Sequence, residues 1–129
     1  MKEKRIREYT AVYSIGAVVY SAVEVLWRGF THWSMSVTGG VCFLLLYIMN
    51  LRLRTSSMLQ KCLMGAGMIT SIEFAVGCVV NLLLGWNVWD YSDMPFHLLG
   101  QVCLFFSMLW FLLCIPGLML ASLLHRRLL

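Results

Sequence analysis

The positive charges of this 129-residue chain form clusters that separate two long apolar stretches. Nine of the ten Lys and Arg residues lie in three clusters: Lys2, Lys4, Arg5 and Arg7; Arg52, Arg54 and Lys61; Arg126 and Arg127. Cytoplasmic loops of membrane proteins are enriched in Lys and Arg, and this bias sets their orientation. If each stretch crosses the bilayer twice, all three clusters lie on one side. The pattern predicts an all-α integral membrane protein with four transmembrane helices and both termini in the cytoplasm (N-in/C-in).

The composition excludes a soluble domain and argues against a nucleic-acid partner. The chain is 60% hydrophobic and 12% charged, with a mean hydropathy of +0.80, whereas soluble domains average about 25% charged residues. The formal net charge of +4 comes from basic residues that flank apolar spans, where such residues meet anionic lipid headgroups. We therefore expect one multi-pass domain in the cell (plasma) membrane, with membrane lipid and not nucleic acid as its surroundings.

Four segments are apolar enough to cross a bilayer, which takes about 20 residues for a hydrocarbon core of about 30 Å. We expect these spans at about residues 9–27, 37–51, 62–84 and 98–124. The first follows a basic start, as in a signal peptide, but it lacks an A-x-A-like cleavage site and is expected to stay uncleaved.

The two halves of the chain resemble each other. Residues 21–24 (SAVE) in the first span have a counterpart in residues 70–73 (TSIE) in the third, and residues 39–42 (GGVC) open the second span much as residues 100–103 (GQVC) open the fourth. Tandem two-helix units share one topology, so the match predicts a parallel two-helix repeat about an axis along the membrane normal.

Small residues recur at four-residue spacing on two spans. Gly67, Ser71 and Ala75 do so on the third, and Ala17 and Ser21 on the first. Helices in lipid associate through close packing at such positions. We expect both faces to contact other helices.

Two intramembrane glutamates, Glu24 and Glu73, are the main functional candidates. A charge deep in a span costs about 2.5–3.5 kcal/mol on insertion scales, so such residues usually face a partner, a cavity or a pathway. Glu24 has Arg28 one turn later, in the favourable order for an ion pair. Glu73 has no charge one turn away; it is protonated, open to water, or hydrogen-bonded across helices to a group such as Asn81 or Gln101. All five are candidates for a substrate or ion pathway, and structural roles are the alternative.

The segment before the fourth span is dense in groups that could hold a ligand. Its candidates are Trp89, Asp90, Tyr91, Ser92, Asp93 and His97. Asp93 precedes His97 by four residues and could pair with it or bind a metal weakly. Equally, Ser92 or Asp93 could cap the fourth helix, with Pro95 in its first turn. We expect capping rather than a metal site.

Enzyme signatures are missing from the sequence. It contains no Walker motif, no G-x-S-x-G elbow and no H-E-x-x-H pair. All five cysteines lie in apolar segments without a C-x-x-C spacing, which is typical of small hydrophobic residues in spans. We expect no enzyme activity and no cofactor; a membrane enzyme acting on lipid is a third alternative, for which no nucleophile with a base is visible.

Several short motifs resemble one known family. Residues 89–92 (WDYS), Pro95-Phe96, Gly100 and residues 103–110 (CLFFSMLW) resemble the W-x-Y-S…P-x-N-x-x-G-x-I-x-L…S-x-x-W stretch of the ABC-transporter permease family often labelled CmpB-like or type IV. Glu73 followed by Gly77, and Glu24 followed by Arg28-Gly29-Phe30, are similar to its other motifs. His97 stands where this family usually has Asn. The resemblance implies a permease-like membrane subunit.

Two function hypotheses follow. In the first, the chain is a small transporter-like or permease-like subunit, and Glu24 and Glu73 line a polar site between the halves that favours a cation, a proton or an amine. Four helices enclose little volume, so this reading implies a homo-oligomer or a partner membrane subunit. In the second, the chain is a non-transporting interaction or scaffold protein whose buried polar groups are structural.

Overall fold

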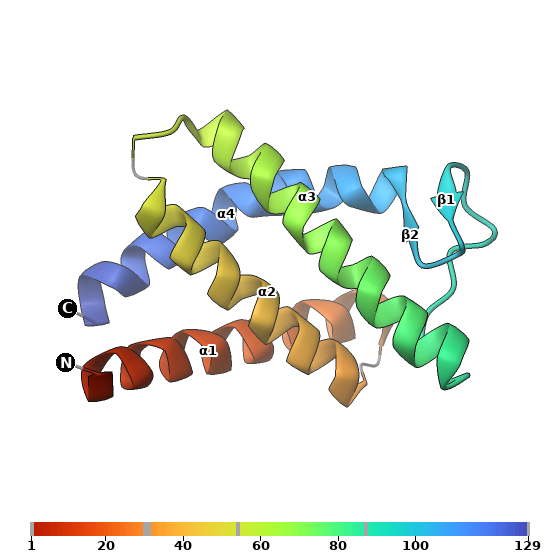
Figure 1. The fold of residues 1–129 in the computed structure, drawn as a ribbon, viewed down its shortest axis with the longest axis horizontal. Coiled ribbons are helices and arrows are strands. Elements are labelled where there is room, and N and C mark those ends of the chain that lie inside the picture. The colour runs from red at the N-terminus through yellow and green to blue at the C-terminus, as the bar shows by residue number, and fades with distance from the viewer. Residues whose placement is uncertain (1, 30–31, 54, 87, 129) are drawn as a thin grey trace. The chain divides into compact units, whose positions relative to one another are not determined.

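Four helices dominate the computed structural model, which describes residues 2–29, 32–53, 55–86 and 88–128 (Figure 1). The elements are α1 (Lys2–Arg28), α2 (Trp33–Arg52), α3 (Met58–Gly77), the π-helical turn η1 (Cys78–Leu83), β1 (His97–Leu98), β2 (Val102–Cys103) and α4 (Leu104–Leu128). Within these described ranges, four helical stretches are long and apolar enough to cross a membrane: Glu3–Trp27, Trp33–Arg52, Met58–Leu83 and Leu104–Arg127. The predicted all-α class with four membrane-spanning helices is confirmed, while the N-in/C-in orientation and the repeat stay predictions.

The predicted bounds hold least well before α4. This helix begins at Leu104 rather than near residue 98, because residues 97–103 form an antiparallel hairpin of β1 and β2. Phe96, Leu99 and Gly100 have positive φ angles of 57°, 53° and 72°, a left-handed conformation that a right-handed helix cannot contain. Capping of the fourth helix by Ser92 or Asp93 is therefore wrong.

Contacts divide the chain into two compact units, each with its own packing. The first unit is Met1–Thr55 with Pro116–Leu129, and the second is Ser56–Ile115. The boundary falls inside α4, directly before Pro116. Proline lacks a backbone N–H and its ring crowds the carbonyl four residues earlier, so the helix is locally weakened where the units divide.

In the first unit, α1 and α2 approach closely at glycines. A Cβ added at Gly16 would lie 2.5 Å from the Cβ of Phe43, and one added at Gly39 would lie 2.5 Å from the Cγ of Tyr20. Close approach of this kind is how helices associate in lipid. The predicted contact face of the first span is also used, since the hydroxyls of Ser21 and Ser36 are 2.6 Å apart.

In the second unit, the close approach of α3 is at Gly77 and not along the predicted small-residue face. A Cβ at Gly77 would lie 2.6 Å from Oε1 of Gln101, whereas one at Gly67 would have no heavy atom within 4 Å. Ser71 and Ala75 are exposed. The prediction for the third span is wrong, because its buried face carries Cys62, Gly65, Glu73 and Gly77.

Candidate functional site

Glu73 lies in α3 with only 8% of its surface exposed. The indole Nε1–H of Trp110, in the part of α4 that belongs to the same unit, donates a hydrogen bond to Oε2 of Glu73 at 2.9 Å. A second hydrogen bond joins the same two helices, between the hydroxyls of Thr70 and Ser107 at 2.9 Å. Of the states considered for Glu73, a hydrogen bond across helices is present, and its donor is Trp110.

The Trp110 donor is compatible with either protonation state of this carboxyl. An indole N–H can only donate, and a carboxyl oxygen can accept from it whether the acid is ionised or protonated. Trp110 can therefore hold Glu73 in place through a change of protonation. An Arg or Lys partner would instead favour the ionised form strongly.

Asn81 and Gln101 belong to a second, buried network that holds the loop after η1. The Nδ2 amide of Asn81 donates to Oε1 of Gln101 at 2.8 Å, and Oδ1 of Asn81 accepts from the backbone N–H groups of Val88 and Trp89 at 2.7 and 3.3 Å. Nε1 of Trp89 donates to the carbonyl of Gln101 at 2.9 Å. Three of the predicted site residues, Asn81, Trp89 and Gln101, thus satisfy one another and the loop backbone, as buried polar groups must.

The exposed part of this loop is ordered by Asp90. Its carboxylate accepts hydrogen bonds from the hydroxyl and the backbone N–H of Ser92. These bonds lower the pKa of Asp90. Tyr91 stacks on Phe106 of α4, with ring centroids 4.8 Å apart. The loop is therefore tied to its own turn and to the start of α4.

Pairing with Asp93 was one alternative for His97, and the structure shows a backbone contact of His97 instead. Nδ1 of His97 accepts a hydrogen bond from the N–H of Gly100 at 3.0 Å, which closes the turn between β1 and β2. Asp93 and His97 are both exposed. Among the described residues, no three His, Cys, Asp or Glu side chains lie close enough together to hold a metal ion.

Glu24 lies in α1 of the first unit and is also 8% exposed. The side chain of its predicted partner Arg28 lies outside the part of the chain that the structure describes, so the ion pair stays a prediction. Glu24 and Glu73 are thus buried carboxyl side chains, one in each unit.

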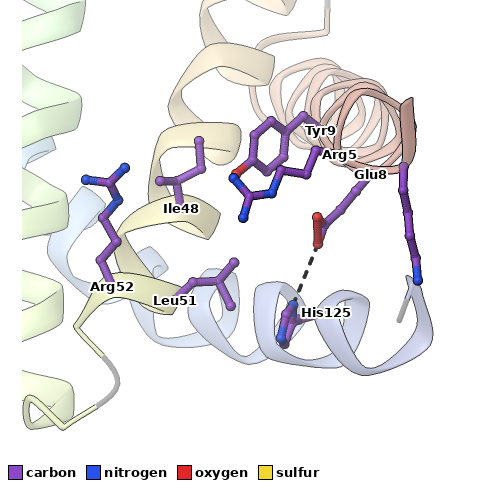
Figure 2. A pocket seen from close by; sticks show the side chains of 8 residues that line it. Arg5, Glu8, Tyr9, Ile48, Leu51, Arg52 and His125 are labelled. Carbon is purple, nitrogen blue, oxygen red and sulfur yellow. Dashed lines mark ion pairs between the residues drawn. The ribbon is translucent and has the colours of Figure 1, made fainter. Parts of the chain in front are cut away.

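A polar cluster at the chain ends of the first unit was missed by the sequence reasoning. The hydroxyl of Tyr47, in α2, donates to Oε2 of Glu8, in α1, at 2.5 Å. Nδ1 of His125, in α4, lies 3.2 Å from the same hydroxyl and 3.7 Å from Oε2 of Glu8. Figure 2 shows Glu8 directed toward His125. Tyr47 is 1% exposed, so this cluster fastens three helices at one end of the unit.

Beside this cluster lies a hollow of about 380 Å³. Its lining comes from α1, from the end of α2 and from α4: Lys4, Arg5, Glu8, Tyr9, Ile48, Leu51, Arg52 and His125. The membrane topology alone could have predicted that these helix ends meet. The start of the first span and the ends of the second and fourth must lie on one side of the membrane, whatever the orientation.

One comparison with known proteins identifies the family of the chain. A family model described as "Putative ABC-transporter type IV" matches residues 8–128. The chain belongs to this family. The match spans both compact units and confirms the resemblance inferred from the residues around Trp89 and Glu73. Neither a curated protein nor a solved structure matches the chain.

The four apolar helices indicate a membrane protein. The family match relates it to ABC transporters. The family match does not assign roles to residues.

Proposed function

We propose that this ABC-transporter type IV protein is a permease-like subunit in which Glu73 exchanges a proton or binds a small cation or amine within the membrane. Glu24, the buried glutamate of the other unit, is the second carboxylate of the proposed pathway. The loop network of Asn81, Trp89 and Gln101 is assigned a structural role instead, because its polar groups bind one another.

One observation carries the proposal: Glu73 is buried in a membrane-spanning helix and is held by a neutral donor, Trp110. Maintaining a carboxylate in a span is costly, and such residues usually mark ion or proton pathways. A neutral donor fixes the position of the carboxyl without fixing its charge. Such an arrangement supports reversible proton or cation binding at Glu73.

The test is ion flux in proteoliposomes with a pH-sensitive dye inside and a potassium diffusion potential across the membrane. Glu73→Gln keeps the size of the side chain and the acceptor for Trp110 but removes the exchangeable proton. We expect it to lower proton flux at least about tenfold and to leave the melting temperature unchanged or raised, because functional buried charges are costly to keep. Glu24→Gln should likewise lower proton flux and leave the melting temperature unchanged or raised.

Glu3→Gln is the matched control, since Glu3 is exposed at the start of α1. It should retain full flux. Full flux in Glu73→Gln would remove the pathway role. If instead the wild-type protein carries no flux and Glu73→Gln lowers its melting temperature, the scaffold function is the better account; the hydrogen-bonded network of Asn81 and Gln101 is the observation that favours it.

The proposal includes a location and an assembly. We place the protein in the plasma membrane with both termini in the cytoplasm, as the three basic clusters favour. Reporter fusions after Thr55 and after Trp86 test this, with activity expected from a cytoplasmic reporter only at Thr55. Four helices enclose little volume, so we also propose a homo-oligomer or a partner membrane subunit. Co-purification of two differently tagged copies of this chain would distinguish a homo-oligomer from assembly with a different subunit.

A further inference from the structure

The lining of the hollow of the first unit combines cationic and apolar side chains. Lys4 and Arg5 come from the first turns of α1, and Arg52 is the last residue of α2. Viewed as in Figure 2, the guanidinium groups of Arg5 and Arg52 lie on opposite sides of Ile48. Two cationic groups and an apolar side chain between them in this view thus belong to the lining of one hollow.

The charge of this lining is positive. Three cations face a single carboxylate, that of Glu8, which is already engaged by Tyr47 and His125. Among the described residues, no carboxylate lies within ion-pairing distance of Lys4, Arg5 or Arg52. The positively charged lining of the hollow is therefore suited to an anionic ligand.

The depth of the hollow in the membrane selects the class of anion. The span of α1 begins at Glu3 and that of α2 ends at Arg52, so the cations stand at the limit of the apolar segments. Ile48 lies one turn further into the span than Arg52, and Leu51 directly precedes Arg52. A phosphate between the cations and hydrocarbon against Ile48 and Leu51 matches the order of groups in a phospholipid, and basic pockets between helix ends are known to bind anionic headgroups.

We propose that this hollow binds the phosphate headgroup of an anionic phospholipid, with Arg5 and Arg52 on the phosphate oxygens and Ile48 and Leu51 against the start of the acyl chains. The volume of about 380 Å³ falls within the range of small-molecule sites. The bound lipid joins the ends of α1, α2 and α4 beside the Glu8, Tyr47 and His125 cluster. This site is separate from Glu73 and does not depend on the proposed transport.

The test is native mass spectrometry of the full chain in neutral detergent, titrated with phosphatidylglycerol or with phosphatidylcholine of the same chain length. We expect phosphatidylglycerol to bind at least about tenfold more tightly. The double variant Arg5→Gln/Arg52→Gln should weaken its binding at least about tenfold, since each juxtamembrane cation contributes to anionic lipid binding. Arg5→Lys/Arg52→Lys should retain most of the affinity.

Arg126→Gln/Arg127→Gln is the matched control, because these exposed arginines end α4 outside the lining of the hollow. It should change the affinity less than twofold. Equal losses in the two Gln variants, or equal binding of the two lipids, would overturn the proposal. Displacement of the lipid by equimolar glycerol phosphate would overturn it in favour of a soluble phosphate ester.

A measurement on the wild-type protein guards against variants that fail to fold. Phosphatidylglycerol should raise the melting temperature, and the increase should shrink between 0.1 and 1 M salt, because screening weakens exposed ion pairs. A stabilisation that is insensitive to salt, or equal for phosphatidylcholine, would contradict a cationic site.

Discussion

The indole of Trp110 donates to the carboxyl of Glu73 across 37 positions of sequence, at 2.9 Å. Both residues are on membrane-spanning helices of one compact unit. The bond gives a buried carboxyl a fixed position through a neutral donor. Its two roles, joining α3 to α4 and orienting Glu73, can be separated by experiment.

Trp110→Phe removes the donor and keeps an aromatic ring. We expect a loss of stability of about 0.6–1.7 kcal/mol, the range of hydrogen bonds between membrane helices. Thermal unfolding in detergent measures it. Trp27→Phe, at a position that is 70% exposed, should be neutral, and equal effects of the two changes would show that the bond to Glu73 contributes nothing.

Tyr47→Phe tests the cluster at the chain ends. The ring stays buried while the hydroxyl that joins Glu8 and His125 is lost. A hydrogen bond to a charged group is worth about 1.5–3 kcal/mol, and we expect a loss of that size in chemical unfolding. Tyr13→Phe on the half-buried side of α1 serves as the control. If it destabilises as much as Tyr47→Phe, the cluster is not what fastens the helices.

Gly77→Ala and Gly67→Ala form a matched pair on α3. The new methyl at position 77 would meet Gln101 at 2.6 Å and Trp89 at 3.0 Å, whereas at 67 it meets nothing within 4 Å. Overpacking at position 77 should lower the free energy of unfolding by about 1–3 kcal/mol. Replacement of the open helical glycine at position 67 should raise it by about 0.5–1 kcal/mol. Gly77→Ala should also speed hydrogen exchange at the backbone N–H of Val88. Unchanged exchange there would contradict the close contact between α3 and the loop.

Ser92→Ala tests the electrostatics of the outer loop. Hydrogen bonds from Ser92 lower the pKa of Asp90 below its ordinary value of 3.8, so the variant should raise that pKa toward 3.8. A depressed carboxyl pKa stabilises the folded loop above the ordinary pKa, and this contribution is lost as the pH falls from about 3.8 through the lower folded value. Titration of the Asp90 carboxyl carbon by NMR measures the shift, with Asp93 as the internal reference. A pKa unmoved by the substitution would exclude the Ser92 hydroxyl as its cause.

Much of the fold could be predicted because hydropathy acts locally. Each span must satisfy its own backbone in lipid, so twenty apolar residues are enough to predict a helix without knowledge of its neighbours. The same reasoning failed between Pro95 and Leu104. Positive φ angles at Phe96 and Leu99 are set by the hairpin and the buried network around Asn81, and no local sequence pattern for non-glycine residues predicts them.

The sequence by itself therefore determined the membrane class, the family motifs and the two glutamates that are costly to bury. Only the tertiary structure decided which groups those residues meet. It placed Trp110 beside Glu73, turned Asn81 and Gln101 toward the loop rather than toward a pathway, and joined Glu8 to Tyr47 and His125. Such partners are 20 to 78 positions apart, and helix rotation selects them. Helix rotation in turn depends on close contacts such as those at Gly39 and Gly77, which become defined only when the helices pack together.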